Sequence, residues 1–180
     1  MPLDRAAIGQ ALRQWVMNTT GLADNKVVFE YQAGPQPEWP YATINPTLAT
    51  ASQGLYDEQA YDSGTLTHVE RRTLTVSVNV YGAQGQTLAI AEAAQDGLEL
   101  LSVSTILAAA GVSLIDKGQL RNLSTLEDTQ FIERFHFDVQ FAAVASTPES
   151  VGQIVSVGIA GQLSQSAGPR ATTSVTVTSA

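Results

Sequence analysis

The residues best suited to chemistry are a histidine and a carboxylate in one alternating segment. His136 and Asp138 stand two apart within "DTQFIERFHFDVQFA", residues 128–142, so both side chains belong to one face of a predicted strand. Such a pair could support proton transfer, and with the acids of residues 49–64 it could serve a small hydrolase or carbohydrate-binding enzyme. No nucleophile motif such as G-x-S-x-G lies near the pair. The favoured interpretation is therefore the water-facing side of a strand.

The other chemical signals in the chain are weaker. "GAQGQT", residues 82–87, follows a strand-like run and opens a helix, but it lacks the lysine and the spacing of a phosphate-binding loop. The chain has no cysteine, so it offers neither a disulfide nor a thiolate metal site. Neither an H-E-x-x-H motif nor a calcium-loop pattern occurs. We therefore predict no metal and no cofactor.

The net charge of −8, from 17 acids against 9 bases, bears on the partners of the protein. A surface of this sign repels phosphates unless its bases cluster, and the notable basic pair is Arg71 with Arg72. We expect no sequence-specific DNA binding, although DNA could pass an acidic wall without sticking. No early segment resembles a signal peptide, and the apolar runs fall far short of the ~20 residues of a membrane span. No membrane partner is expected.

The elements that must position these residues include two amphipathic helices. One is predicted from Asp4 to Gly21, and the other over residues 84–101, followed by a shorter helical piece at residues 103–110. The apolar stripe of the first helix is Ile8, Ala11, Leu12, Trp15 and Val16. That of the second is Leu88, Ala91, Ala94, Leu98 and Leu101.

Strands make up most of the remaining core. They are predicted at residues 26–31, 41–45 (ended by Pro46), 66–81, 112–115, 120–123 and 128–142. Because helices and strands do not alternate as βαβ units, the sequence predicts an α+β fold, a mostly antiparallel sheet with the two helices packed on one face. The apolar side of the two longest strands carries Leu74, Val76, Val78, Phe131, Phe135, Phe137, Val139 and Phe141.

Two segments offer surfaces that an isolated monomer would not need. Residues 49–64 are polar and lie between strands, and we predict a long hairpin loop that contacts a partner. Residues 150–180 contain one charged side chain, Arg170, and are otherwise β-prone, which favours pairing with a neighbouring chain over pairing with the protein's own sheet. We therefore divide the chain into a core, 1–147, and a C-terminal extension, 148–180. The predicted interface residues are Tyr56, Asp57, Glu58, Tyr61, Ile154, Val155, Val157 and Ile159.

In order and spacing, these elements resemble the phage neck terminator family, which is similar to the tail-terminator proteins of long-tailed phages. The segments that carry the resemblance are Pro40–Ile44, Arg72–Gly82, Arg121–Ser124 and Glu133–Phe141, within about residues 5–145.

The resemblance implies a structural virion protein of the neck or tail, assembled in the host cytoplasm, with no enzymatic activity and no cofactor. Such proteins form a ring, typically a hexamer, that caps the tail tube, stops its growth and offers a docking surface to the head. The implied partners are further copies of the chain, the tail tube and head-connector proteins, with the sheath as a further candidate and DNA passing through the ring. The main alternative is another phage head-completion or connector protein. The remote alternative is the small hydrolase that uses His136 and Asp138.

Overall fold

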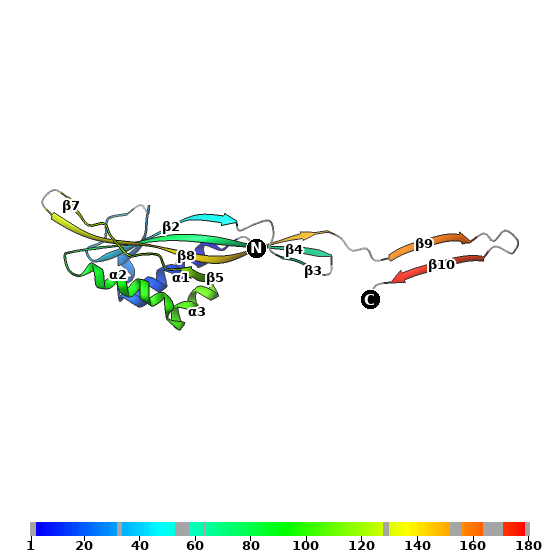
Figure 1. Cartoon of the computed structure of the whole chain (residues 1–180), viewed down its shortest axis with the longest axis horizontal. Helices are drawn as coiled ribbons and strands as arrows, with labels where there is room; N and C mark the ends of the chain where they lie inside the picture. Colours follow the sequence, from blue (N-terminus) through cyan, green and yellow to red (C-terminus); the bar gives the residue numbers. More distant parts are fainter. Residues whose placement is uncertain are drawn as a thin grey trace.

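A computed structural model describes residues 3–31, 34–52, 58–62, 64–127, 130–151, 156–163 and 171–178 (Figure 1). The helices are α1 (Arg5–Thr20), α2 (Thr87–Asp96) and α3 (Leu101–Ala109). The strands are β1 (Val27–Phe29), β2 (Tyr41–Ser52), β3 (Glu58–Asp62), β4 (Thr65–Gly82), β5 (Val112–Asp116), β6 (Arg121–Asn122), β7 (Thr125–Glu127), β8 (Gln130–Ser150), β9 (Ser156–Leu163) and β10 (Ala171–Thr178). The predicted α+β class is confirmed.

Eight strands of the described residues form one sheet around the long central pair β4 and β8. This antiparallel pair keeps a single register from Thr65 opposite Ser150 to Gly82 opposite Glu133. On the far side of β4 lie β2 and β3, and the short β1 runs parallel to β2 outside it. On the far side of β8 lie β5, β6 and β7 in succession. The sheet therefore has two different edges, which we call the β1 edge and the β5–β7 edge.

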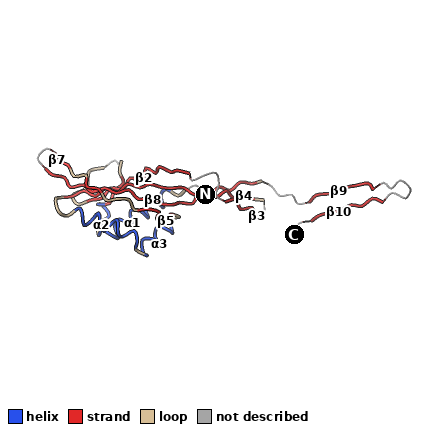
Figure 2. The backbone as a smooth tube through the Cα atoms, viewed as in Figure 1, coloured by secondary structure: helices blue, strands red, loops and turns tan. Residues whose placement is uncertain are grey.

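All three helices cover the same face of the sheet, as the blue segments in Figure 2 show. Alternation along β4 and β8 turns one apolar parity toward them, so Val78 pairs with Phe137 and Val76 with Val139. The indole ring of Trp15 on α1 meets β8 edge-to-face, with its centroid 6.3 Å from that of Phe137. The predicted apolar face is confirmed for its buried members: Leu74, Val76, Val78, Phe135, Phe137, Val139 and Phe141.

The ends of α1 follow from its sequence. The carboxylate of Asp4 accepts hydrogen bonds from the backbone N–H groups of Ala6 at 3.1 Å and Ala7 at 3.0 Å, which satisfies two donors that the helix leaves unpaired. Gly21 ends the helix in the left-handed conformation, at φ 69°, where a side chain would be strained. The predicted start and stop of this helix are confirmed.

The prediction of one helix over residues 84–101 is wrong. α2 ends at Asp96, a 3-10 turn covers Gly97–Glu99, and α3 begins at Leu101 after Leu100 adopts an extended backbone. The break lies where the chain approaches α1, because a Cβ on Gly97 would collide with the side chain of Thr19. The helix is therefore interrupted between α2 and α3 at the point where the chain packs closely against α1.

The break also changes which leucines are buried. Leu88 and Leu101, both predicted in the apolar stripe, are 41% and 81% exposed. Ala91, Ala94 and Leu98 are buried as predicted. Phe131 shares the parity of the buried Phe135, as predicted, but its side chain is 47% exposed.

Two predicted strand limits need correction. β2 does not end at Pro46 but continues to Ser52, and its register against β4 shifts between Asn45 and Ala49. A bulge is one of the few places where a strand accepts proline, since proline has no N–H to donate. The predicted loop of residues 49–64 is also wrong in part, because β2 and β3 occupy much of it.

The C-terminal residues form a separate hairpin. β9 and β10 pair antiparallel, with Ser156 opposite Thr178 and Leu163 opposite Ala171. Among the described residues neither strand pairs with the eight-stranded sheet, and Figure 1 draws the hairpin beyond the end of β4 and β8. β8 itself runs through residue 147 to Ser150. The division into a core, 1–147, and an extension, 148–180, stays a prediction.

Candidate functional site

The sheet face away from the helices carries a polar network centred on Asn79. The Asn79 side chain is buried, and its Oδ1 accepts hydrogen bonds from Nε of Arg134 at 3.1 Å and from Nη2 at 2.8 Å. The same oxygen lies 3.1 Å from Nδ1 of His136, while Nδ2 of Asn79 donates to Oε1 of Glu30 at 3.3 Å. Because one buried amide joins three charged or titratable side chains, it holds β4, β8 and the residue that follows β1 in a fixed arrangement.

His136 and Asp138 are neighbours, as predicted, and Ser77 joins them. Nε2 of His136 lies 3.5 Å from Oδ1 of Asp138, and the Ser77 hydroxyl donates to that same oxygen at 2.5 Å. In a Ser-His-Asp triad the imidazole stands between hydroxyl and carboxylate and takes the proton. Here the carboxylate stands between the other two, so the imidazole is not positioned to deprotonate Ser77. The hydrolase alternative gains no support from this geometry.

An aromatic stack closes the same face near one end of β4. The rings of Tyr41 and Tyr81 are stacked with centroids 4.9 Å apart, and the Arg134 guanidinium lies 5.3 Å from the Tyr81 centroid. Gln36 donates to the Tyr41 hydroxyl at 2.9 Å, which ties the proline-rich segment to the sheet. The Trp39–Pro40 peptide bond in that segment is cis. The polar side chains on this face of β8 therefore make structural contacts here and do not simply face water.

Glu133 has a role that the sequence did not reveal. Its Oε2 accepts hydrogen bonds from the backbone N–H groups of Gly85 and Thr87, both at 3.1 Å, at the N-terminus of α2. Desolvation acts to raise the pKa of Glu133, but hydrogen bonds from Thr87, Gly85 and Gln86 outweigh it and hold the pKa below the ordinary value of 4.5. Gln86 makes no side-chain cap, so Glu133 supplies the cap from β8. The only hint in the sequence was an acid placed on the apolar parity.

The predicted interface residues remain predictions. Tyr56, Asp57, Ile154 and Val155 lie outside the described residues. Glu58 and Tyr61 belong to β3, which pairs with the start of β4, and the Tyr61 side chain is 54% exposed.

The last two predicted interface residues, Val157 and Ile159, lie in β9 opposite Val177 and Val175. Strand pairing in the described residues does not join β3 to β9. The structure therefore places two predicted residues in each of two hairpins and does not bring the hairpins together.

Several basic side chains are paired with acids. Nη2 of Arg72 lies 2.6 Å from Oε2 of Glu70, and Nη2 of Arg13 lies 3.2 Å from Oδ2 of Asp24. Nζ of Lys117 lies 2.7 Å from Oε1 of Glu99. These pairs neutralise three of the basic side chains on the described surface.

Two further properties concern the described part of the chain. It contains no group of three or more His, Cys, Asp or Glu side chains placed to hold a metal ion. None of its helices combines the length and the apolar character needed to cross a membrane.

The protein matches one family of known proteins. Residues 6–165 match the model of a family described as phage neck terminator protein. No curated protein matches. Among the solved structures that match, one chain is 18% identical, with 78% of this chain and 93% of that chain covered and a TM-score of 0.35. A similarity of this size says nothing of function. The family match covers all of the eight-stranded sheet and, except for Arg5, all of the three helices.

Proposed function

Since the chain belongs to the family of phage neck terminator proteins and has a structural role in the phage neck or tail, we propose that it forms a ring that ends the tail tube and joins it to the head. The ring is proposed to contain six copies. The observation that carries this proposal is the family match over residues 6–165. The proposed partners are further copies of the chain, the tail tube, head-connector proteins and the sheath.

The shape of the core supports a ring subunit. β4 and β8 are paired over their full shared length, and three helices brace one face, which makes a stiff body. The two sheet edges differ, so a contact between copies joins unlike surfaces. Head-to-tail contacts of this kind generate a closed ring when the rotation between copies is right.

The charge supports passage of DNA through such a ring. With a net charge of −8, the ring as a whole repels phosphates, and Arg13, Arg72 and Lys117 are each held by an acid. A wall that gave many free cations to the phosphate backbone would retain DNA through counterion release. We propose that DNA slides through the channel without specific binding.

The C-terminal extension, 148–180, is proposed to contact a neighbouring subunit or an adjoining ring. β9 and β10 pair with each other and leave two strand edges available. Unpaired strand edges add readily to other sheets. Val157 and Ile159 of β9, and Glu58 and Tyr61 of β3, are the described residues that we assign to such contacts.

An assembly experiment tests the proposed function. Tail tubes are polymerised from purified tube protein with and without this chain, and their lengths and ends are imaged by electron microscopy. We expect rings at one tube end, arrested growth, and docking of filled heads only when the chain is present. Tubes that grow and dock identically in its absence would contradict the proposal. A ring found on the head and never on a tube end would favour the head-completion or connector alternative.

A further inference from the structure

The β5–β7 edge ends in an exposed apolar pair. Leu126 of β7 lies opposite Phe131 of β8, and the two side chains are 69% and 47% exposed. Phe131 shares the parity of Phe135, yet no helix buries it as the helices bury Phe135. In Figure 1 this pair of strands forms the extremity of the sheet farthest from β9 and β10. We call Leu126 and Phe131 the tip.

The opposite edge carries a groove between α1 and β1. It has a volume of about 610 Å³, within the range of ligand pockets, about 300–1,000 Å³. Ala6, Met17 and Phe29 supply apolar lining, Arg5 supplies a positive charge, and Arg13 lies there paired with Asp24. Gly9 lies close to the opposite wall, since a Cβ there would lie 3.3 Å from Cζ of Phe29 and the ring would have to shift slightly.

One lining arginine is committed to structure and the other is not. Nε of Arg13 donates to the carbonyl oxygen of Val27 at 2.9 Å, so it occupies an acceptor of the β1 strand. This contact makes simple strand addition at β1 less favourable than insertion of side chains. Arg5 has no hydrogen bond or ion pair with another described residue and is available to a partner.

We propose that the tip of one copy packs into the α1–β1 groove of the next copy, which makes it the contact that closes the ring. This inference rests on the proposed function. The tip and the groove lie on opposite edges of one sheet, so each copy offers one of each, as a head-to-tail ring requires. An apolar pair that includes an aromatic ring suits an apolar groove as the energetic centre of an interface.

Charge favours the same occupant. β7 carries an acid, Glu127, next to Leu126, and the whole chain has a net charge of −8. Arg5 at the groove therefore attracts the acidic surface of another copy and helps to steer the two edges together.

Cross-linking tests the contact directly. The chain has no cysteine, so the double variant Ala6→Cys/Leu126→Cys carries the only two thiols. With a short bifunctional thiol reagent on the assembled protein, we expect a ladder of covalent multimers in a denaturing gel. The control variant Ala6→Cys/Leu101→Cys keeps the groove thiol and moves the second one to a leucine that is 81% exposed on the helical layer. It should give no ladder.

Substitutions give a second measurement. Phe131→Ser at the exposed tip should weaken self-association by about 30-fold, the size expected for an interface anchor, without loss of folding. Ala6→Trp should fill the groove and weaken self-association to a similar extent. Ala89→Trp, at an exposed position of α2, should leave self-association unchanged.

The outcomes separate this inference from the proposed function. Rings that form normally but give no ladder, and that tolerate Phe131→Ser and Ala6→Trp, would overturn the tip-and-groove contact and leave the ring proposal standing. A chain that stays monomeric both alone and with tail tubes would overturn both.

Discussion

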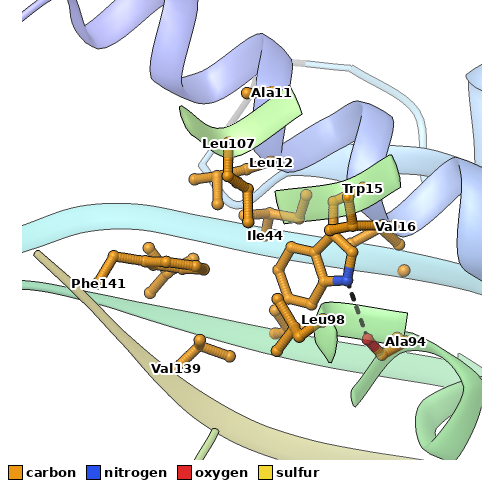
Figure 3. Close-up of a cluster of buried hydrophobic side chains, with 14 of the residues drawn as sticks. Ala11, Leu12, Trp15, Val16, Ile44, Ala94, Leu98, Leu107, Val139 and Phe141 are labelled. Atoms are coloured by element: carbon orange, nitrogen blue, oxygen red, sulfur yellow. Dashed lines mark hydrogen bonds between the residues drawn. The ribbon is translucent and has the colours of Figure 1, made fainter. Parts of the chain in front are cut away.

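The indole N–H of Trp15 donates to the backbone carbonyl oxygen of Ala94 at 2.9 Å, which joins α1 to α2 within the core (Figure 3). Trp15 is fully buried, and its ring also meets Phe141 edge-to-face with centroids 6.2 Å apart. One side chain therefore links two helices to the central strands.

Trp15→Phe should lower the free energy of unfolding by about 1–3 kcal/mol, because it leaves the buried Ala94 carbonyl without its donor. Urea denaturation measures the change. The control is Trp39→Phe at the other tryptophan, which is half-buried in the proline-rich segment and should cost less. Equal losses in the two variants would show that the Trp15–Ala94 hydrogen bond contributes nothing of its own.

Glu133 should make stability depend on pH in the acidic range. Its pKa in the folded protein lies below the ordinary 4.5, so the folded state binds fewer protons there than the unfolded state. The stabilisation is complete above about pH 4.5 and is lost as the pH falls through the lower folded pKa. Glu133→Gln should cost about 1 kcal/mol near pH 7, the usual size for a helix cap.

The difference between Glu133→Gln and the unmodified protein should therefore shrink as the pH falls below about 4.5, measured by urea denaturation at a series of pH values. Glu92→Gln, at an exposed position of the same helix, is the matched control and should show neither the loss nor the trend. A difference that stays constant down to the acid transition would refute the proposed cap.

Gly97→Ala should destabilise the fold by about 1–3 kcal/mol, since the new methyl group would collide with Thr19 at the junction of α2 with α1. Gly34→Ala is the control, because a Cβ there meets nothing within 4 Å. Thermal unfolding compares the two. An equally stable Gly97→Ala variant would mean that the helix break has another cause.

Deletion of residues 152–180 should weaken assembly more than folding. β8 keeps its pairing to Ser150, and Val151 N–H still donates to the Gly64 carbonyl oxygen at 3.1 Å, so the eight-stranded sheet is unchanged. Light scattering for assembly and denaturation for stability measure the two effects on one sample. An unchanged oligomer in the truncated protein would rule out a role of the extension in contacts between copies.

Local signals predicted much of the fold. Asp4 and Gly21 mark the ends of α1 because capping depends on adjacent residues, and alternation along β4 and β8 sets their buried face. Predictions from periodicity failed where a residue distant in the sequence determines the local structure. The break at Gly97 depends on Thr19, and the course of β2 past Pro46 depends on the bulge against β4.

The candidate site was harder to predict for the same reason. The neighbouring position of His136 and Asp138 follows from spacing alone, and it is confirmed. The roles of Asn79 and Glu133 depend on residues about fifty positions away in the chain, such as Glu30 and Gly85, so nothing beside them in the sequence indicates what they bind. Phe131 was predicted on the apolar face, because periodicity does not show where a helical layer stops, and Leu126 lay outside the predicted strands.

The most direct test of the account is the mass of the assembled protein, measured by light scattering or native mass spectrometry, alone and after addition to tail tubes. We expect the mass of a closed ring, six times the 19.0 kDa chain, in at least one of the two conditions. A mass that corresponds to the monomer in both conditions would contradict it.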